Sequence, residues 1–155
     1  MPHVADRWLG GTITNFSEIN KLIKRLKDLK RQKQTGDLRK YTKREQLEFD
    51  REIEELEEKI GGIATLDAPP TILVVFDVRN ETTAIREGNR VGMPIVGICD
   101  TNVNPHVVTH PIPANDDAVK SIELMTNLVA EAVLEGKKNV EVPKKVAQKR
   151  KVAIK

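Results

Sequence analysis

The run TILVVFD, residues 71–77, is short, continuously apolar and ends in an acid. Such a run is typical of a β-strand that is buried on both faces of a sheet. A second run of this kind, IVGICD, occupies residues 95–100, and a helix-like segment at 80–91 separates the two. Strands that alternate with helices predict a parallel sheet with right-handed crossovers. The sequence therefore predicts the α/β class.

The chain after residue 100 completes this predicted sheet. Residues 107–109 (VVT) favour a short third strand, and Asn115 is well placed to cap a last helix. We therefore expect a partial parallel sheet of about three strands flanked by helices. The side chains expected to face the core are Ala84, Ile85 and Val91 in the first of these helices and Ile122, Met125, Val129 and Val133 in the last.

Residues 17–62, upstream of the sheet, predict an inserted antiparallel coiled-coil hairpin of two helices. Apolar residues recur three or four apart in both halves, and the segment 42–45 (TKRE) has the pattern of a capping box. Gly36 supplies a stop between the helices. The two expected seams are Ile19, Leu22, Ile23, Leu26 and Leu29, and Phe49, Ile53, Leu56 and Ile60.

Four regions follow from this pattern. Residues 1–16 form a linker and the start of the α/β domain, and 17–62 form a protruding helical hairpin. Residues 63–136 form the α/β domain, and 137–155 form a basic tail whose low hydrophobicity predicts disorder.

Charge is strongly segregated although the net charge is only +3. Residues 21–44 hold eleven Lys and Arg against two acids, whereas residues 45–59 hold eight acids against two bases. A basic helix attracts phosphates and releases their counterions, although Lys-rich helices can also be simple solvated faces.

Two features of the sequence indicate the cellular compartment. The single cysteine, Cys99, cannot form an internal disulfide, which favours a reducing compartment. The segment 1–6 lacks the basic and apolar regions of a secretory signal, and no apolar run is long enough to span a bilayer. We expect the cytoplasm or an organelle interior, and no membrane partner.

Asp77 and Asp100 follow the two predicted strands, at the edge where α/β enzymes bind ligands. They could hold a phosphate or a metal ion. Asp-Thr-Asn at 100–102 also favours a plain turn, and no glycine-rich fingerprint accompanies the acids, so the turn interpretation is preferred.

Other candidate sites have simpler explanations. His106 and His110 flank a predicted strand without a Cys or Glu to complete a zinc set. Asp116 and Asp117 suit the first turn of a helix, where carboxylates oppose the helix dipole. Cys99 ends an apolar strand and is expected to be an inert buried thiol. We predict neither a catalytic group nor a metal or other cofactor.

A series of motifs resembles the bacterial or organellar form of small-subunit ribosomal protein two. They occur in unbroken order between residues 1 and 136. They are RWLGG at 7–11, TNF at 14–16, VFD at 75–77, GMPIVGI at 92–98, DTN at 100–102, IPANDDA at 112–118 and AVLEG at 132–136. The resemblance implies an α/β domain with a protruding coiled-coil hairpin.

The resemblance also implies a structural, non-enzymatic protein of the small ribosomal subunit that supports translation on cytoplasmic or organellar ribosomes. Its expected partners are small-subunit rRNA and neighbouring small-subunit proteins, ribosomal protein one among them. Members of the family carry a further N-terminal part with the first strands of the sheet. We therefore expect a fragment, a misplaced start codon or a reduced form, with an open sheet edge.

The candidate RNA-binding residues lie on the basic arm and beside the Gly pair at 10–11. They are Arg7, Lys21, Lys24, Arg25, Lys27, Lys30 and Arg31. Two rival functions remain: a nucleotide- or sugar-phosphate-binding enzyme that uses Asp77 and Asp100, and a coiled-coil interaction module that works through the hairpin seam.

Overall fold

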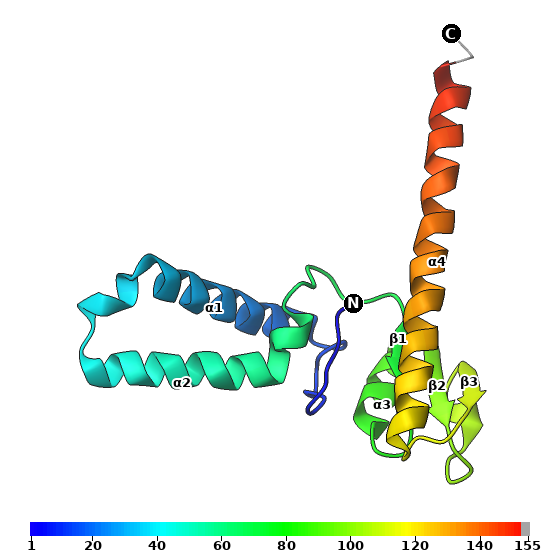
Figure 1. Cartoon of the computed structure of the whole chain (residues 1–155), viewed down its shortest axis with the longest axis horizontal. Coiled ribbons are helices and arrows are strands. Elements are labelled where there is room, and N and C mark those ends of the chain that lie inside the picture. The colour runs from blue at the N-terminus through cyan, green and yellow to red at the C-terminus, as the bar shows by residue number, and fades with distance from the viewer. Residues whose placement is uncertain (153–155) are drawn as a thin grey trace.

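A computed structural model of the protein describes the fold of residues 1–152 and the side chains of residues 1–139. A helical hairpin extends to one side of a small sheet, and one long helix runs past the sheet (Figure 1). The elements follow in the order α1 (Phe16–Thr35), α2 (Lys43–Ile60), β1 (Leu73–Val75), α3 (Thr82–Arg90), β2 (Ile95–Cys99), β3 (His110–Pro113) and α4 (Val119–Val152). Short 3-10 turns at Asp37–Lys40, Gly61–Ile63 and Pro105–Val107 complete the chain.

The sheet confirms the predicted α/β class. Its three strands are parallel in the order β1-β2-β3, with Leu73 opposite Ile95 and Ile98 opposite Ile112. The central strand β2 is the most buried, and Ile95 is fully enclosed. The core of this part consists of Val75, Val78, Ile85, Ile95, Cys99 and Val108.

The third strand was predicted at the wrong place. Residues 105–107 form a turn, and the strand begins at His110. Pairing with β2 begins at Thr109. Its N–H donates to the carbonyl of Ile95 at 3.0 Å, and its Oγ1 accepts the N–H of Ile95 at 3.1 Å. The β-branched residues 107–109 favour a strand by local propensity, whereas the observed strand β3 contains two prolines, which are unfavourable in most strands. An edge strand tolerates them.

The helices α1 and α2 lie side by side and run antiparallel (Figure 1). The capping box is present as predicted: the Thr42 hydroxyl accepts the N–H of Glu45, and the Glu45 carboxylate accepts the N–H of Thr42 at 2.9 Å. Gly36 ends α1 with a left-handed φ of 80°, which glycine adopts without a steric penalty. Supercoiling of the pair stays a prediction.

The hairpin has its own core, separate from that of the sheet. Its buried members are Ile19, Ile23, Leu26, Leu29, Ile53, Ile60 and Ile63. Leu22 was wrongly assigned to this seam: it is 39% exposed, whereas Ile23 is 1% exposed. Val4, Leu9 and Phe16 pack against the same cluster, so part of the segment 1–16 supports the hairpin base.

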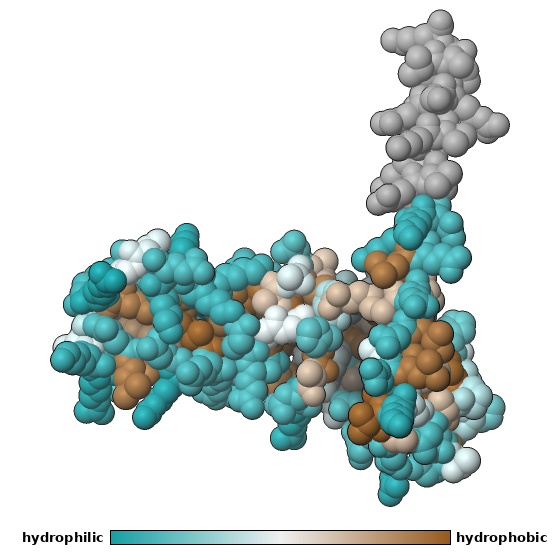
Figure 2. Space-filling view, in the orientation of Figure 1, coloured by the Kyte–Doolittle hydropathy of each residue, from teal (hydrophilic) through white to brown (hydrophobic). Residues whose placement is uncertain are grey.

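The last two helices differ from expectation in two ways. Val91 is exposed, because α3 ends at Arg90. The α4 stripe Ile122, Met125, Val129 and Val133 is only half-buried, and exposed leucines accompany it, so apolar side chains show over the lower part of α4 (Figure 2).

The helix α4 extends through residue 152, and residues 153–155 lie outside the described part. The disorder expected from residue 137 stays a prediction. No helix in the described part of the chain is long and apolar enough to cross a membrane.

Candidate nucleic-acid interface

The helix α1 divides its surface between an apolar stripe and basic faces. Ile19, Ile23, Leu26 and Leu29 turn toward α2, so the residues between them project into solvent. Six of the seven candidate RNA-binding residues lie on this helix, and five of those six are exposed while Lys30 is half-buried. Figure 2 shows the resulting hydrophilic covering of the hairpin.

Two of the basic candidates bridge to α2. The Arg25 guanidinium makes a two-pronged contact with Glu52, with Nε at 2.8 Å and Nη2 at 2.9 Å from the two carboxylate oxygens. This bond is the main reason that the pKa of Glu52 lies below its usual range. Lys30 pairs with Glu57, and Lys33, outside the candidate set, pairs with Asp50 at 2.9 Å. These cations bridge the two helices, whose contact is formed by the buried seam.

Two other candidates pair within α1. Lys21 contacts Glu18 at 2.7 Å and Arg31 contacts Asp28 at 3.1 Å, both three residues apart. All four of these side chains are more than half exposed. Exposed pairs of this kind contribute little stability and exchange partners easily, so both cations remain accessible to an external anion.

Lys24, Lys27 and Arg7 take part in none of the ion pairs found among residues 1–139. Lys24, Lys27 and Arg31 are spaced three and four apart, so they project from one side of α1. We call these three residues the basic face. The basic face lies away from the apolar seam, and two of its three residues, Lys24 and Lys27, are outside the ion pairs found among residues 1–139.

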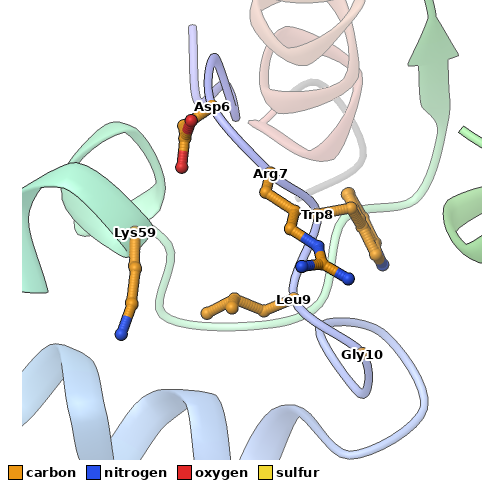
Figure 3. A pocket seen from close by; sticks show the side chains of 6 residues that line it. All are labelled: Asp6, Arg7, Trp8, Leu9, Gly10 and Lys59. Carbon is orange, nitrogen blue, oxygen red and sulfur yellow. The ribbon is translucent and has the colours of Figure 1, made fainter. Parts of the chain in front are cut away.

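Arg7 lies at the base of the hairpin in a shallow pocket. Asp6, Trp8, Leu9, Gly10 and Lys59 line the pocket with it (Figure 3). Arg7 is exposed, while the Trp8 ring beside it is half-buried. The structure gives Trp8 a packing role at the junction and leaves the Arg7 guanidinium facing solvent.

One buried carboxylate fixes this junction, and the sequence analysis did not identify it. Glu87 on α3 is 8% exposed and accepts hydrogen bonds from the loop that precedes α1. Its Oε1 accepts from Gly11 N at 2.6 Å and Trp8 Nε1 at 3.3 Å. Its Oε2 accepts from Ile13 N at 3.0 Å, Thr14 N at 3.1 Å and Thr14 Oγ1 at 3.2 Å. Glu87 therefore joins the hairpin base to the α/β part.

A signal for Glu87 was present in the sequence. It lies three residues after Ala84, so on a helix it shares the face that Ala84 and Ile85 turn inward. An acid on an apolar helix face is almost never buried without partners. The partners lie more than seventy residues away in the chain, so the sequence alone could not name them.

The acids at the strand ends behave largely as turn residues. Asp77 has a φ of 69° and its Oδ1 accepts the N–H of Asn80 at 3.0 Å, while Asp100 accepts the N–H of Thr101 at 2.7 Å. His106 and His110 are exposed, and neither belongs to a metal-ligand grouping within the described residues. Cys99 is buried, as predicted, and burial raises the pKa of its thiol.

Comparison with known proteins adds independent information. The family model described as Ribosomal protein S2 matches residues 1–136. Proteins named "Small ribosomal subunit protein uS2" from Salinibacter ruber and Pseudoalteromonas translucida are each 47% identical, and one from Acinetobacter baylyi is 46% identical. Each alignment covers 88% of this chain but only 42%, 57% and 55% of the respective relative.

The chain therefore spans about half the length of the curated relatives that it matches. The matched region includes the hairpin, the three strands and the first turns of α4. The motifs quoted from the sequence all fall inside it. This chain belongs to the ribosomal protein S2 family.

Proposed function

We propose that the chain is a structural constituent of the small ribosomal subunit and that it binds small-subunit rRNA without catalysing a reaction. Three features support this: family membership, the names of the relatives and the basic face of α1. The observation that carries the RNA proposal is the placement of Lys24 and Lys27. They lie on one exposed side of the helix and are outside the ion pairs found among residues 1–139.

The seven candidate residues then have different roles. Lys24, Lys27 and Arg31 contact phosphates directly, and Arg7 adds a contact at the hairpin base. Arg25 and Lys30 act mainly within the hairpin through Glu52 and Glu57. Lys21 exchanges its exposed partner Glu18 for a phosphate at low cost. Recognition is by charge and shape, because aromatics make up only 3% of the chain and few bases can stack.

The proposed division of labour follows the expected regions. Residues 17–62 act as the projecting arm, and residues 1–16 with 63–136 act as its support. Glu87 sets the position of the arm on that support through its bonds to Gly11, Ile13 and Thr14. The partners are small-subunit rRNA and neighbouring small-subunit proteins, including ribosomal protein one, on cytoplasmic or organellar ribosomes.

Binding to small-subunit rRNA at several salt concentrations tests the RNA proposal. The test protein carries Lys24→Glu, Lys27→Glu and Arg31→Glu. The matched control carries Arg79→Glu, Arg86→Glu and Arg90→Glu, which change the charge equally at exposed sites of the α/β part. Circular dichroism verifies that both variants keep their helix content.

The basic-face variant should bind much more weakly, and its salt dependence should flatten. Each phosphate contact contributes roughly 0.7–0.9 to the slope of log affinity against log salt, so losing three contacts removes about 2–3 from it. The α/β control should change this slope by less than the contribution of one phosphate contact. Equal losses in both variants would show that net charge, not the basic face, governs binding, and would overturn the proposal.

A further inference from the structure

The pocket at the hairpin base combines charged groups of both signs with apolar side chains. Its volume is about 310 Å³, and it is formed by residues 6–10 together with Lys59 near the end of α2. In Figure 3 the Leu9 side chain lies between Lys59 on one side and Arg7 on the other. This volume is at the lower end of the roughly 300–1,000 Å³ range of small-ligand sites. The pocket is therefore large enough for one nucleotide base.

The segment that builds the pocket is fixed by contacts along its length. Before the pocket, the N–H of His3 donates to the carbonyl of Gly62 at 3.0 Å, and a Cβ on Gly62 would overlap the carbonyl oxygen of His3. Within the pocket, the carbonyl of Leu9 accepts from Thr12 N at 3.2 Å and from Thr12 Oγ1 at 2.6 Å. After the pocket, the loop is bound by Glu87. A site that is already ordered loses little entropy when its ligand binds.

Two cations at the pocket are available to an anion. Arg7 takes part in none of the ion pairs among residues 1–139, and Lys59 pairs with Glu55 on the exposed surface of α2. Such an exposed pair is weak and exchanges readily. The N–H of Gly10 is outside the hydrogen bonds found among the same residues, and a Cβ on Gly10 would meet no atom within 4 Å. Side chains and backbone here are therefore free to contact phosphate oxygens.

The other groups of the pocket suit a base. Trp8 and Leu9 offer apolar contact area to a planar ring. Asp6 is exposed and outside the ion pairs of the described side chains, and its ionised carboxylate only accepts hydrogen bonds. Guanine alone among the four bases presents two adjacent donors on its Watson–Crick edge, N1–H and N2–H. These two donors match the two oxygens of one carboxylate, so the pocket favours guanine.

We propose that this pocket takes one unpaired guanosine nucleotide of the RNA. The phosphate lies at Arg7 and Lys59. The base lies against Trp8 and Leu9, where Asp6 accepts from the guanine edge. This inference rests on the proposed function, because it assigns a further contact to the same RNA. The basic face of α1 acts by charge, so the pocket adds a base-specific contact where the arm joins its support. Specific recognition of RNA commonly uses unpaired bases in this way.

Binding of five-nucleotide RNAs to the full chain tests the pocket. The fluorescence of Trp8, the single Trp of the chain, reports the binding. The probes are UUGUU, UUAUU, UUCUU and UUUUU, together with free guanosine monophosphate. We expect UUGUU to bind roughly tenfold more tightly than the other RNAs, the discrimination that a good two-pronged contact to a base provides. Free guanosine monophosphate should bind more weakly than UUGUU, because it lacks the flanking phosphates.

Two variants separate the contact to the base from the contact to the phosphate. Asp6→Asn keeps the shape but places an amide donor against the donors of guanine, so the preference for UUGUU should fall to about twofold or less. The control Asp67→Asn, an exposed change in the connector after the hairpin, should keep the preference. Arg7→Ala should weaken all four RNAs without changing their ranking. Its control, Arg79→Ala on the α/β part, should leave the affinities unchanged.

Equal affinity of the wild type for the four RNAs, or the same preference in Asp6→Asn and Asp67→Asn, would overturn the proposal. Tighter binding of free guanosine monophosphate than of UUGUU would overturn the assignment to RNA.

The variant of the basic face separates this proposal from the proposed function. It should bind all four RNAs more weakly and still prefer UUGUU. If it loses binding to small-subunit rRNA while Asp6→Asn changes nothing, the pocket proposal alone is wrong. If its binding to rRNA equals that of the α/β control while the preference for UUGUU depends on Asp6, the pocket stands and the role of the basic face is wrong.

Discussion

The carboxylate of Glu87 accepts the backbone N–H of Gly11 at 2.6 Å, across seventy-six positions of sequence. It also holds Trp8, Ile13 and Thr14, so one buried side chain accepts from three backbone N–H groups and two side-chain donors of the loop before α1. A carboxylate is suited to this position because both of its oxygens accept hydrogen bonds and neither donates. This contact links the loop at the base of the hairpin to α3 of the α/β part.

Replacing Glu87 by Gln should loosen the junction. The amide NH2 replaces one acceptor oxygen in a site built from donors, so either the bonds from Gly11 and Trp8 or those from Ile13 and Thr14 are lost. We expect a loss of about 1–3 kcal/mol of stability at the junction. Hydrogen exchange should then accelerate at Gly11, Ile13 and Thr14. Glu123→Gln, an exposed change on α4, is the control and should leave these amides protected.

The same contact should give the junction a dependence on acid pH. Burial alone would raise the pKa of Glu87, but the hydrogen bonds from Gly11, Ile13 and Thr14 outweigh burial and lower it. Because the folded pKa lies below the unfolded one, the stabilisation is fully present above the ordinary range of Glu, near 4.3. It is lost as the pH falls through the lowered folded value.

Trp8 reports this transition, since it is the single Trp of the chain and its Nε1 donates to Glu87. Its fluorescence should stay constant at neutral pH and change as the solution becomes acidic. In Glu87→Gln the transition should disappear. If the fluorescence transition persisted unchanged in this variant, another carboxylate would be responsible for it.

Periodicity and capping predicted the elements of this fold better than their connections. The box at Thr42 and Glu45 and the stop at Gly36 are local, so the sequence placed both helices correctly. The third strand was misplaced because its start is set by the pairing of Thr109 with Ile95, which is not local. For the same reason the partners of Glu87 were beyond prediction.

Charge patterning located the candidate interface but could not rank its residues. Seven cations looked equivalent in the sequence, because partners on α2 are not visible there. The structure separates Arg25, which is held by Glu52, from Lys24 and Lys27, which lie outside the ion pairs of the described side chains. Ranking the seven cations by their availability to RNA therefore required the register of α1 against α2.

A side chain at Gly97 should destabilise the fold, because Val78 and Val108 pack directly against the backbone of β2 at this residue. A Cβ there would lie 2.8 Å from Val78 Cγ2 and 2.9 Å from Val108 Cγ1. We expect Gly97→Ala to cost about 1–3 kcal/mol through overpacking, measured by chemical unfolding. The control is Gly136→Ala on α4, where a Cβ meets no atom within 4 Å. This change should be neutral or stabilise by up to about 1 kcal/mol through helix propensity.

The two leucines Leu22 and Leu26 separate the observed hairpin seam from the predicted one. Both fit the heptad spacing, but Leu26 is 1% exposed and Leu22 is 39% exposed. Leu26→Ala should cost about 2–5 kcal/mol, because it removes buried methyl groups and leaves a cavity beside Ile23 and Ile53. Leu22→Ala should cost well under that amount, since Ala favours the helix and little burial is lost.

Unfolding followed by helix circular dichroism measures both effects on the full chain. A larger loss for Leu22→Ala than for Leu26→Ala would mean that α1 is rotated about its axis relative to the structure. Such a rotation would turn Lys24, Lys27 and Arg31 further from α2 and would break the register that pairs Arg25 with Glu52. The pair of leucine variants therefore tests the register of α1 against α2, which separates Arg25 from Lys24 and Lys27, with a measurement that involves no RNA.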